Sequence, residues 1–381
     1  MNERLNKSYE PRRNDLCWCG SGKKYKKCHM NRKTSEPVKI SEILEREQRA
    51  FGKKMCLHPK ASNKECKGNF VKAHTVQRIC LTKIAEKGHV YAFTSDANIF
   101  RSKAKKVHVL VPRKIGIKNA STFTGFCAKH DDEIFRPIEK HDFTCCSEHT
   151  FLLGYRSLCR EIFAKKAVLD MQDLFSTMDR GKPLEVQIPL QRFSSAFLAG
   201  AQAGYNDLLK IKTEYDRILE EKDFEKVRYY ILIFDSYPDV LCAGGFWPQY
   251  DFVGHKVQEP VAPESEGMQF SLITTDKGGA AIFTWVNNKG ISEEFIKSLN
   301  SISESDLPSA ILRFVFEYFE NTYIKPSWWE NLSKESRAKL HHRMAMLDSL
   351  FMEHQPNCLI DDGLRVVNWR VVDRRTNFSI V

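Results

Sequence analysis

Four sulfur and nitrogen ligands crowd into one short segment near the start of this sequence. The segment from Arg13 to His29 reads RNDLCWCGSGKKYKKCH, in which the spacing Cys-x-Cys-x8-Cys-His is made by Cys17, Cys19, Cys28 and His29. This number of thiolate and imidazole groups suits a closed tetrahedral zinc site, which a short peptide can wrap. Gly20 and Gly22 permit the tight turn between the ligand pairs. We therefore expect residues 1–32 to form a small metal knuckle.

The segment resembles the SEC-C motif, a metal-binding knuckle known from the carboxy-terminal tail of the SecA translocation ATPase and attached to many other bacterial proteins. The resemblance rests on the ligands, the glycines, the Lys-Lys-Tyr run and the Arg-Asn-Asp lead-in. It implies that the segment binds zinc or iron and contacts a partner protein or a ribosome. Four protein ligands leave no open position for a substrate, which also favours docking over catalysis.

Composition places the chain among intracellular globular proteins. Its 381 residues favour two or three domains, and 42% of them are hydrophobic, enough for a sizeable core. No apolar run approaches the roughly 18 residues of a membrane span, and the polar start MNERLNKSYE is unlike a signal peptide. We expect a soluble cytoplasmic protein, in which the 12 cysteines are reduced and several bind metal.

Positive charge is concentrated in the first part of the chain. Through residue 150 there are 32 Lys and Arg against 16 Asp and Glu, a balance of +16, and the rest carries 27 against 32, or −5. This asymmetry favours an anionic partner for the N-terminal half. RNA or DNA fits better than a membrane, because no basic amphipathic helix with a bulky apolar face is evident. The alternative is a basic surface that only aids solubility.

The pattern of elements predicts an α+β protein in five segments. These are the SEC-C knuckle at 1–32, a linker and tether helix at 33–55, a Cys/His module at 56–142, a helical segment at 143–225 and a C-terminal mixed α/β-sheet domain at 226–381. Ser41 is the expected N-cap of the tether helix. In the Cys/His module we expect short strands at 71–74, 89–93 and 107–112, the last stopped by Pro112, and a helix over 77–88.

Long helices are expected at 143–174 and 195–225, where apolar side chains recur with the helical period. The C-terminal domain should contain strands at 227–236, 268–276, 280–286 and 363–373, with helices within 307–323 and 333–352. Its segment 238–252, PDVLCAGGFWPQYDF, favours a turn with an apolar plug. This half contains no Gly-rich phosphate loop, nucleophile elbow or HExxH motif, so no residue constellation supports a third hypothesis, a hydrolase or transferase that uses this half.

A second group of Cys and His residues lies after the tether helix. Cys56 and Cys66 can supply one knuckle, and Cys127 with His130, spaced Cys-x2-His, can supply another. Because nine residues separate the first pair, His58 is an equally good candidate ligand. We expect a second structural zinc site here. The alternative is that these cysteines are small buried apolar residues.

The order of knuckle, strand with a His, and second knuckle leading into a helix resembles the treble-clef finger of HNH-type endonucleases. The resemblance implies that His74 is the general base and that Asp131 or Asp132 binds Mg²⁺ or Mn²⁺. The basic residues that would hold phosphate are Lys72, Arg78 and Lys129. Asn119 lies further ahead of the second knuckle than the family's Asn, and an Asp would replace the family's metal-binding His. A hydrogen-bonded structural role is the alternative for His74.

The sequence therefore supports two hypotheses. In the first, the protein is a metal-binding adaptor whose basic half engages nucleic acid, a ribosome or a protein partner through zinc-stabilised modules. In the second, it is an HNH-type endonuclease, for which the resemblance implies a setting in prokaryotic defence.

Overall fold

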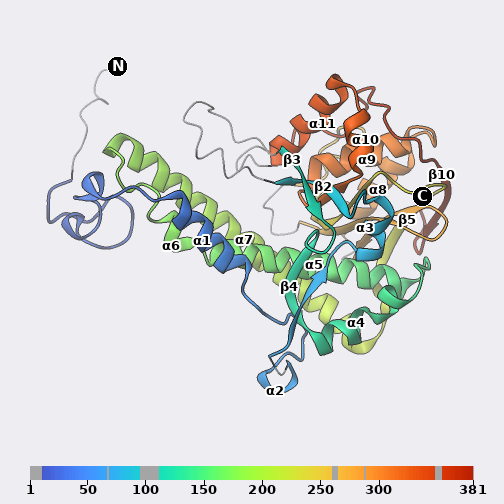
Figure 1. Ribbon diagram of the computed structural model, residues 1–381, viewed down its shortest axis with the longest axis horizontal. Helices are drawn as coiled ribbons and strands as arrows, with labels where there is room; N and C mark the ends of the chain where they lie inside the picture. Colours follow the sequence, from blue (N-terminus) through green and yellow to red (C-terminus); the bar gives the residue numbers. More distant parts are fainter. Residues whose placement is uncertain are drawn as a thin grey trace. The chain divides into compact units, whose positions relative to one another are not determined.

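The computed structural model describes residues 11–66, 68–94, 111–259, 265–286, 289–347 and 354–380 (Figure 1). The α-helices are α1 (Ile40–Phe51), α2 (Asn63–Cys66), α3 (Arg78–Ile84), α4 (Ala128–Lys140), α5 (Ser147–Leu169), α6 (Gln172–Phe175), α7 (Leu184–Glu221), α8 (Ile291–Asn300), α9 (Leu307–Tyr318), α10 (Pro326–Asn331) and α11 (Lys334–Leu347). The strands are β1 (Phe70–His74), β2 (His89–Thr94), β3 (Val111–Gly116), β4 (Thr122–Cys127), β5 (Arg228–Phe234), β6 (Val240–Phe246), β7 (Met268–Thr274), β8 (Gly279–Trp285), β9 (Thr322–Ile324) and β10 (Val371–Thr376). Short 3-10 helices are η1 (Tyr25–Lys27), η2 (Arg32–Thr34) and η4 (Phe224–Lys226).

The chain divides into two compact units. One comprises Met1–Lys53 and Ala164–Asn206, and the other comprises Lys54–Phe163 and Asp207–Val381. Two of the three boundaries fall within α5 and α7, so each of these helices contributes to both units. This division is coarser than the five segments that the sequence predicts.

The first unit combines the N-terminal segment with the adjoining parts of α5 and α7. Arg180, which precedes α7, donates to Glu42 of α1 at 3.2 Å. Lys53, after α1, pairs with Asp170 at 2.8 Å. The N-cap of α1 is Lys39, and Ser41 already lies inside the helix. The expected capping role of Ser41 is therefore wrong.

The second unit is built around an eight-stranded sheet in the order β10-β5-β8-β7-β6-β9-β2-β3. Every pair of neighbours in it is antiparallel. The central strands β7 and β8 are buried along their whole length, because helices cover both faces. The prediction of an α+β fold with a C-terminal sheet domain is confirmed.

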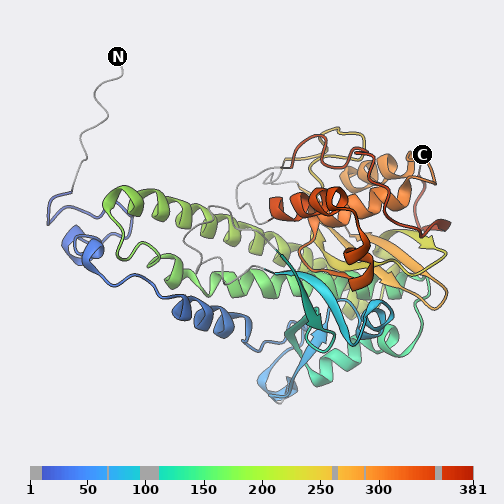
Figure 2. The same ribbon diagram turned by 45° about the horizontal axis from the view of Figure 1, so that its top comes forward.

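Aromatic residues fill the layer between one face of this sheet and the helices α8 and α9. The ring centroids of Phe283 in β8 and Phe246 in β6 lie 5.4 and 4.8 Å from the ring centroid of Phe314 in α9. On the other face, α5 approaches β8 closely at Gly154, where an added Cβ would lie 2.5 Å from Thr284 Oγ1. Figures 1 and 2 show α9 and α11 packed side by side, which adds a further helix outside the aromatic layer.

The expected ββα module is present, with a long insertion. β1 pairs with β4 in an antiparallel sheet of two strands, and α4 follows β4 directly. The segment between β1 and β4 supplies α3, β2 and β3, and β2 pairs with β9 in the large sheet. Residues of the Cys/His module therefore extend the sheet of the C-terminal domain.

Three details of the expected strands need correction. The segment with Gly244 and Gly245 is the strand β6 and not a turn. Its Gly244 packs against the Phe319 ring, from which an added Cβ would lie only 2.9 Å away, so a glycine is needed at this position. Pro112 lies inside β3, which is an edge strand and tolerates a missing N–H. The expected strand at 107–112 otherwise lies outside the described residues. The final strand starts at Val371, so most of 363–373 is irregular.

The long helices also differ in their limits from the expectation. α7 has 38 residues and begins at Leu184, so Pro189 lies inside it. The first expected long helix is divided into α5 and the short α6. None of the described helices is both long and apolar enough to cross a membrane.

Candidate metal centres

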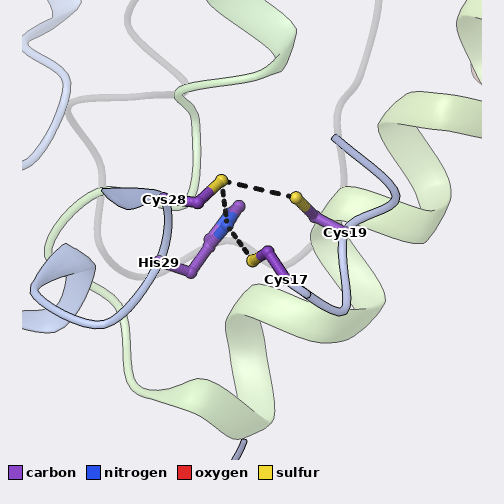
Figure 3. A group of neighbouring side chains, drawn as sticks. All are labelled: Cys17, Cys19, Cys28 and His29. Atoms are coloured by element: carbon purple, nitrogen blue, oxygen red, sulfur yellow. Dashed lines mark hydrogen bonds between the residues drawn. The ribbon is translucent and has the colours of Figure 1, made fainter. Parts of the chain in front are cut away.

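The four ligands expected in the N-terminal knuckle point toward one another (Figure 3). The Nδ1 atom of His29 lies 3.2 Å from Cys17 Sγ and 3.1 Å from Cys28 Sγ. The sulfur atoms of Cys19 and Cys28 are 3.5 Å apart. All four ligand atoms lie within 4.8 Å of one another, as donors around a single ion must.

The local sequence explains how the two ligand pairs meet. The amide of Cys17 donates to the carbonyl of Lys23 at 2.8 Å and closes a small hairpin. Gly20 and Gly22 turn this hairpin with φ angles of +76° and +69°, which residues with a Cβ rarely adopt. The buried Tyr25 then opens η1, and its carbonyl accepts the amides of Cys28 and His29. This turn thereby places Cys28 and His29 next to Cys17 and Cys19.

A buried carboxylate from outside the knuckle orients its histidine. Nε2 of His29 lies 2.9 Å from Oδ2 of Asp179, whose side chain is 0% exposed. The nearby carboxylate favours the tautomer with the proton on Nε2, which leaves the lone pair of Nδ1 for a metal. Arg32 lies 3.6 Å from the other carboxylate oxygen. Asp179 is far from the knuckle in sequence and no motif surrounds it, so sequence reasoning missed it.

Electrostatics in the knuckle follow from burial and hydrogen bonding. Burial raises the pKa of the Cys17 thiol to about 12. Burial also opposes ionisation of Cys19, but hydrogen bonds from Ser21, Cys28 and Cys17 outweigh it and lower the pKa of Cys19 to about 7. Burial of Asp179 is outweighed in the same way by His29 and Arg32, so the pKa of Asp179 is lowered.

A second cluster gathers residues from three separate parts of the chain. His130 Nδ1 lies 3.3 Å from the sulfur atoms of both Cys56 and Cys127, and 3.8 Å from that of Cys66. These four ligand atoms also lie within 4.8 Å of one another. A pair of cysteines and a cysteine-and-histidine pair that are distant in sequence are thus brought together, as the treble-clef pattern predicts.

The ββα module supports this second cluster. Cys127 is the N-cap residue of α4 and His130 lies in its first turn, so a single helix end presents both. Cys66 is the last residue of α2. Cys56 lies on an extended segment beside β4, where the amides of Met55 and Leu57 donate to Thr124 and Gly125 at 3.1 and 2.9 Å.

His58, the alternative ligand, lies next to the cluster and not in it. Its ring stacks on that of His130, with centroids 4.0 Å apart and planes 6° apart. Its Nδ1 accepts the amide of Lys60 at 3.0 Å. Burial, together with the charges of His130 and Lys212, lowers the pKa of His58 to about 4, so its ring is neutral near pH 7. The structure therefore favours Cys66 as the fourth ligand.

Residues 13–31 match the family model of the SEC-C motif. No curated protein and no solved structure matches the chain. The SEC-C motif and the two clusters together indicate that the protein binds metal ions such as zinc. The donor set of each cluster, three thiols and one imidazole, is that of a closed structural zinc site.

A buried network behind the second cluster was also missed by sequence reasoning. The hydroxyl of Tyr155 lies 2.7 Å from Asp216, to which Lys212 donates at 2.6 Å. The same hydroxyl contacts the carbonyl of Leu57 at 3.4 Å, next to the ligand Cys56. Within the second unit, this network connects α5 and α7 with the segment that presents Cys56.

The residues expected to be catalytic have separate surroundings. His74 ends β1, and its Nε2 lies 3.1 Å from the carbonyl of Ile117, to which it donates. Burial lowers the pKa of His74 and raises that of Asp131. Asp132 is exposed and pairs with Arg136. Among the described residues, these three do not form one of the groups whose ligand atoms could share an ion.

The expected phosphate-binding residues differ from one another in their environment. Lys72 on β1 and Arg78 at the start of α3 are exposed. Lys129, by contrast, pairs with Glu65, which raises the pKa of Lys129 through their hydrogen bond. A nucleic-acid contact by Lys129 would first have to break that pair.

Proposed function

We propose that this protein is a zinc-binding adaptor that docks on nucleic acid, free or within a ribosome, through its basic N-terminal half. Two closed clusters of three cysteines and one histidine support this proposal. In each, protein donors occupy every position around a tetrahedral ion, so the ions would stabilise docking modules and would not activate a substrate.

The surface of the SEC-C knuckle supports nucleic acid as the partner. Its exposed cationic residues are Arg12, Arg13, Lys23, Lys24 and Lys27. In the part of the chain that the structure describes, no carboxylate lies within 4.0 Å of these side chains' charged groups. Unpaired cations are available to neutralise phosphates and release counterions. Leu16, which is 72% exposed between them, offers an apolar contact to a base or a sugar.

In the second module, the cationic side chains of α4 are paired with carboxylates. Besides Lys129, the residues Arg136 and Lys140 of α4 both lie near the carboxylate of Asp132. Internal pairing lowers the gain from a phosphate contact, because an existing ion pair is lost. We therefore assign the main contacts to the SEC-C knuckle.

The test compares two charge reversals of equal size in the full chain. Lys23→Glu with Lys24→Glu changes the knuckle, and Lys277→Glu with Lys334→Glu changes exposed lysines of the C-terminal half. Fluorescence anisotropy would report binding to a labelled single-stranded RNA and a DNA duplex over a range of salt concentrations. For the wild type we expect affinity to fall steeply with salt.

In the knuckle variant, the slope of log affinity against log salt should decrease by about 2, roughly one for each lost phosphate contact. The control variant should keep the wild-type slope. Absent or salt-insensitive binding by the wild type would reject nucleic acid and leave a protein partner. Equal losses in both variants would reject the knuckle as the contact.

A further inference from the structure

A third group of metal-ligating side chains lies in the C-terminal half, where no motif predicts one. It consists of Glu317 near the end of α9, with His354 and Cys358 in the segment after α11. Their ligand atoms lie within 4.8 Å of one another. The Nδ1 atom of His354 is 3.0 Å from Oε1 of Glu317. Three donors of different type therefore converge on one point.

The surroundings hold these donors in place. The ring of His354 stacks on Tyr318, with centroids 4.2 Å apart. Oε2 of Glu317 accepts a hydrogen bond from Arg343 at 3.0 Å, which leaves Oε1 on the side of His354. Arg343 also donates to the carbonyl of Cys358. Ligating carboxylates and histidines commonly have such partners around them.

The local charge balance accepts a divalent cation. Ion pairs connect the guanidinium groups of Arg313, Arg343 and Arg365 with four carboxylates. These carboxylates belong to Glu317, Asp361, Asp362 and Asp306. With His354 and Cys358 neutral, this network carries a net charge of −1. A divalent ion that displaces the thiol proton of Cys358 to solvent brings the network to zero.

We propose that Glu317, His354 and Cys358 bind a divalent transition metal ion such as zinc. Three protein ligands leave a fourth tetrahedral position for water or an exchangeable ligand, unlike the two closed clusters. The His354 side chain is 19% exposed, so solvent reaches the edge of the group. The mixed nitrogen, oxygen and sulfur donors suit zinc or cobalt better than magnesium or calcium. This site does not depend on nucleic-acid binding.

The experiment measures metal content of the full chain after zinc reconstitution and removal of loosely bound ions. Cys358→Ser and His354→Gln should each contain one equivalent less than the wild type. Cys145→Ser, which changes a partly exposed cysteine outside the three groups, should match the wild type. In cobalt-substituted protein, the difference spectrum between wild type and Cys358→Ser should show ligand-field bands and a thiolate-to-cobalt transition.

Equal metal content in the wild type and both ligand variants would overturn the proposal and leave a hydrogen-bonded ion network only. The experiment compares the metal content of each variant with that of the wild type. Its result therefore does not depend on whether the two closed clusters contain metal. Far-UV circular dichroism would check folding. If the buried Cys358→Ser variant does not fold, His354→Gln, at a half-buried ring, decides the question.

Discussion

At the scale of single residues, the SEC-C knuckle depends on one carboxylate outside the motif. Asp179 is fully buried, and its Oδ2 lies 2.9 Å from Nε2 of His29. Such a partner both orients the imidazole and raises its basicity toward the metal. The metal site is therefore completed by a residue that belongs to the turn before α7.

We predict that Asp179→Asn weakens zinc binding at the knuckle by about 10- to 100-fold, because the imidazole loses its anionic partner. Competition with a chromophoric chelator would measure this affinity in the full chain. Asp173→Asn, at an exposed residue of α6, is the matched control and should have the wild-type affinity. An unchanged affinity in Asp179→Asn would show that the carboxylate has no influence on the ion.

A second residue-scale prediction concerns the endonuclease hypothesis. The Nε2 atom of His74 donates a hydrogen bond to the carbonyl of Ile117. Among the described residues, His74 belongs to no group of side chains that could hold a metal ion. We expect purified protein to leave plasmid DNA and RNA intact with Mg²⁺, Mn²⁺ or Ni²⁺. Cleavage by the wild type that is lost in His74→Ala would contradict the adaptor proposal and restore His74 as a general base.

At the scale of elements, the start of α5 contains a histidine that is held neutral. Burial lowers the pKa of His149, and His141 acts in the same direction while Glu148 opposes it. Its Nδ1 accepts the amide of Thr144 at 3.1 Å, which requires the unprotonated ring. A positive charge at a helix N-terminus is also unfavourable.

This histidine predicts a loss of stability in acid. An unfolded chain takes up a proton on His149 near pH 6.5, whereas the folded chain resists it. The free energy of unfolding should therefore be fully retained above pH 6.5 and fall as the pH drops below it. Urea denaturation at pH 7.5 and 5.5 should show a smaller fall for His149→Gln than for wild type or for His342→Gln, an exposed control on α11. Equal falls in all three would contradict the prediction.

Two helical glycines should respond in opposite directions to the same substitution. Gly154→Ala in α5 places a Cβ 2.5 Å from Thr284 Oγ1 and should destabilise by about 1–3 kcal/mol through overpacking. Gly200→Ala in α7 meets nothing within 4 Å and should stabilise by up to about 1 kcal/mol through helix propensity. Thermal denaturation would measure both. A stabilised Gly154→Ala variant would mean that α5 does not pack closely on β8.

At the scale of the whole molecule, metal binding is distributed over separate parts of the chain. The knuckle cluster belongs to the first compact unit and the second cluster to the other. They share no ligand, so each can lose its ion alone. Structural zinc contributes directly to the folding free energy of the segment that binds it.

We predict that Cys28→Ser and Cys127→Ser each remove one equivalent of metal relative to the wild type, and that the double variant loses two. Elemental analysis of purified protein would count the ions. Treatment with a strong chelator should also lower the Tm of the wild type. Loss of both equivalents in one single variant would show that the clusters are coupled and contradict their independence.

Much of the local structure could be predicted because the responsible residues are close in sequence. The ligands of the knuckle lie within one turn-rich segment, and β5, β7 and β8 are continuous apolar runs. β6 was missed for a physical reason. A strand buried on both faces shows no alternation, and its Gly244 and Gly245 imitate a turn although close packing against Phe319 requires a glycine there.

The sequence by itself determined the SEC-C motif, the basic N-terminal half and the α+β class, since spacing, charge and periodicity are properties of neighbouring residues. Only the tertiary structure decided that Cys66 and not His58 joins the second cluster, that Asp179 supports His29, and that Glu317 meets His354 and Cys358. These contacts join residues far apart in the chain. Their formation depends on how helices and strands pack, which no local pattern encodes.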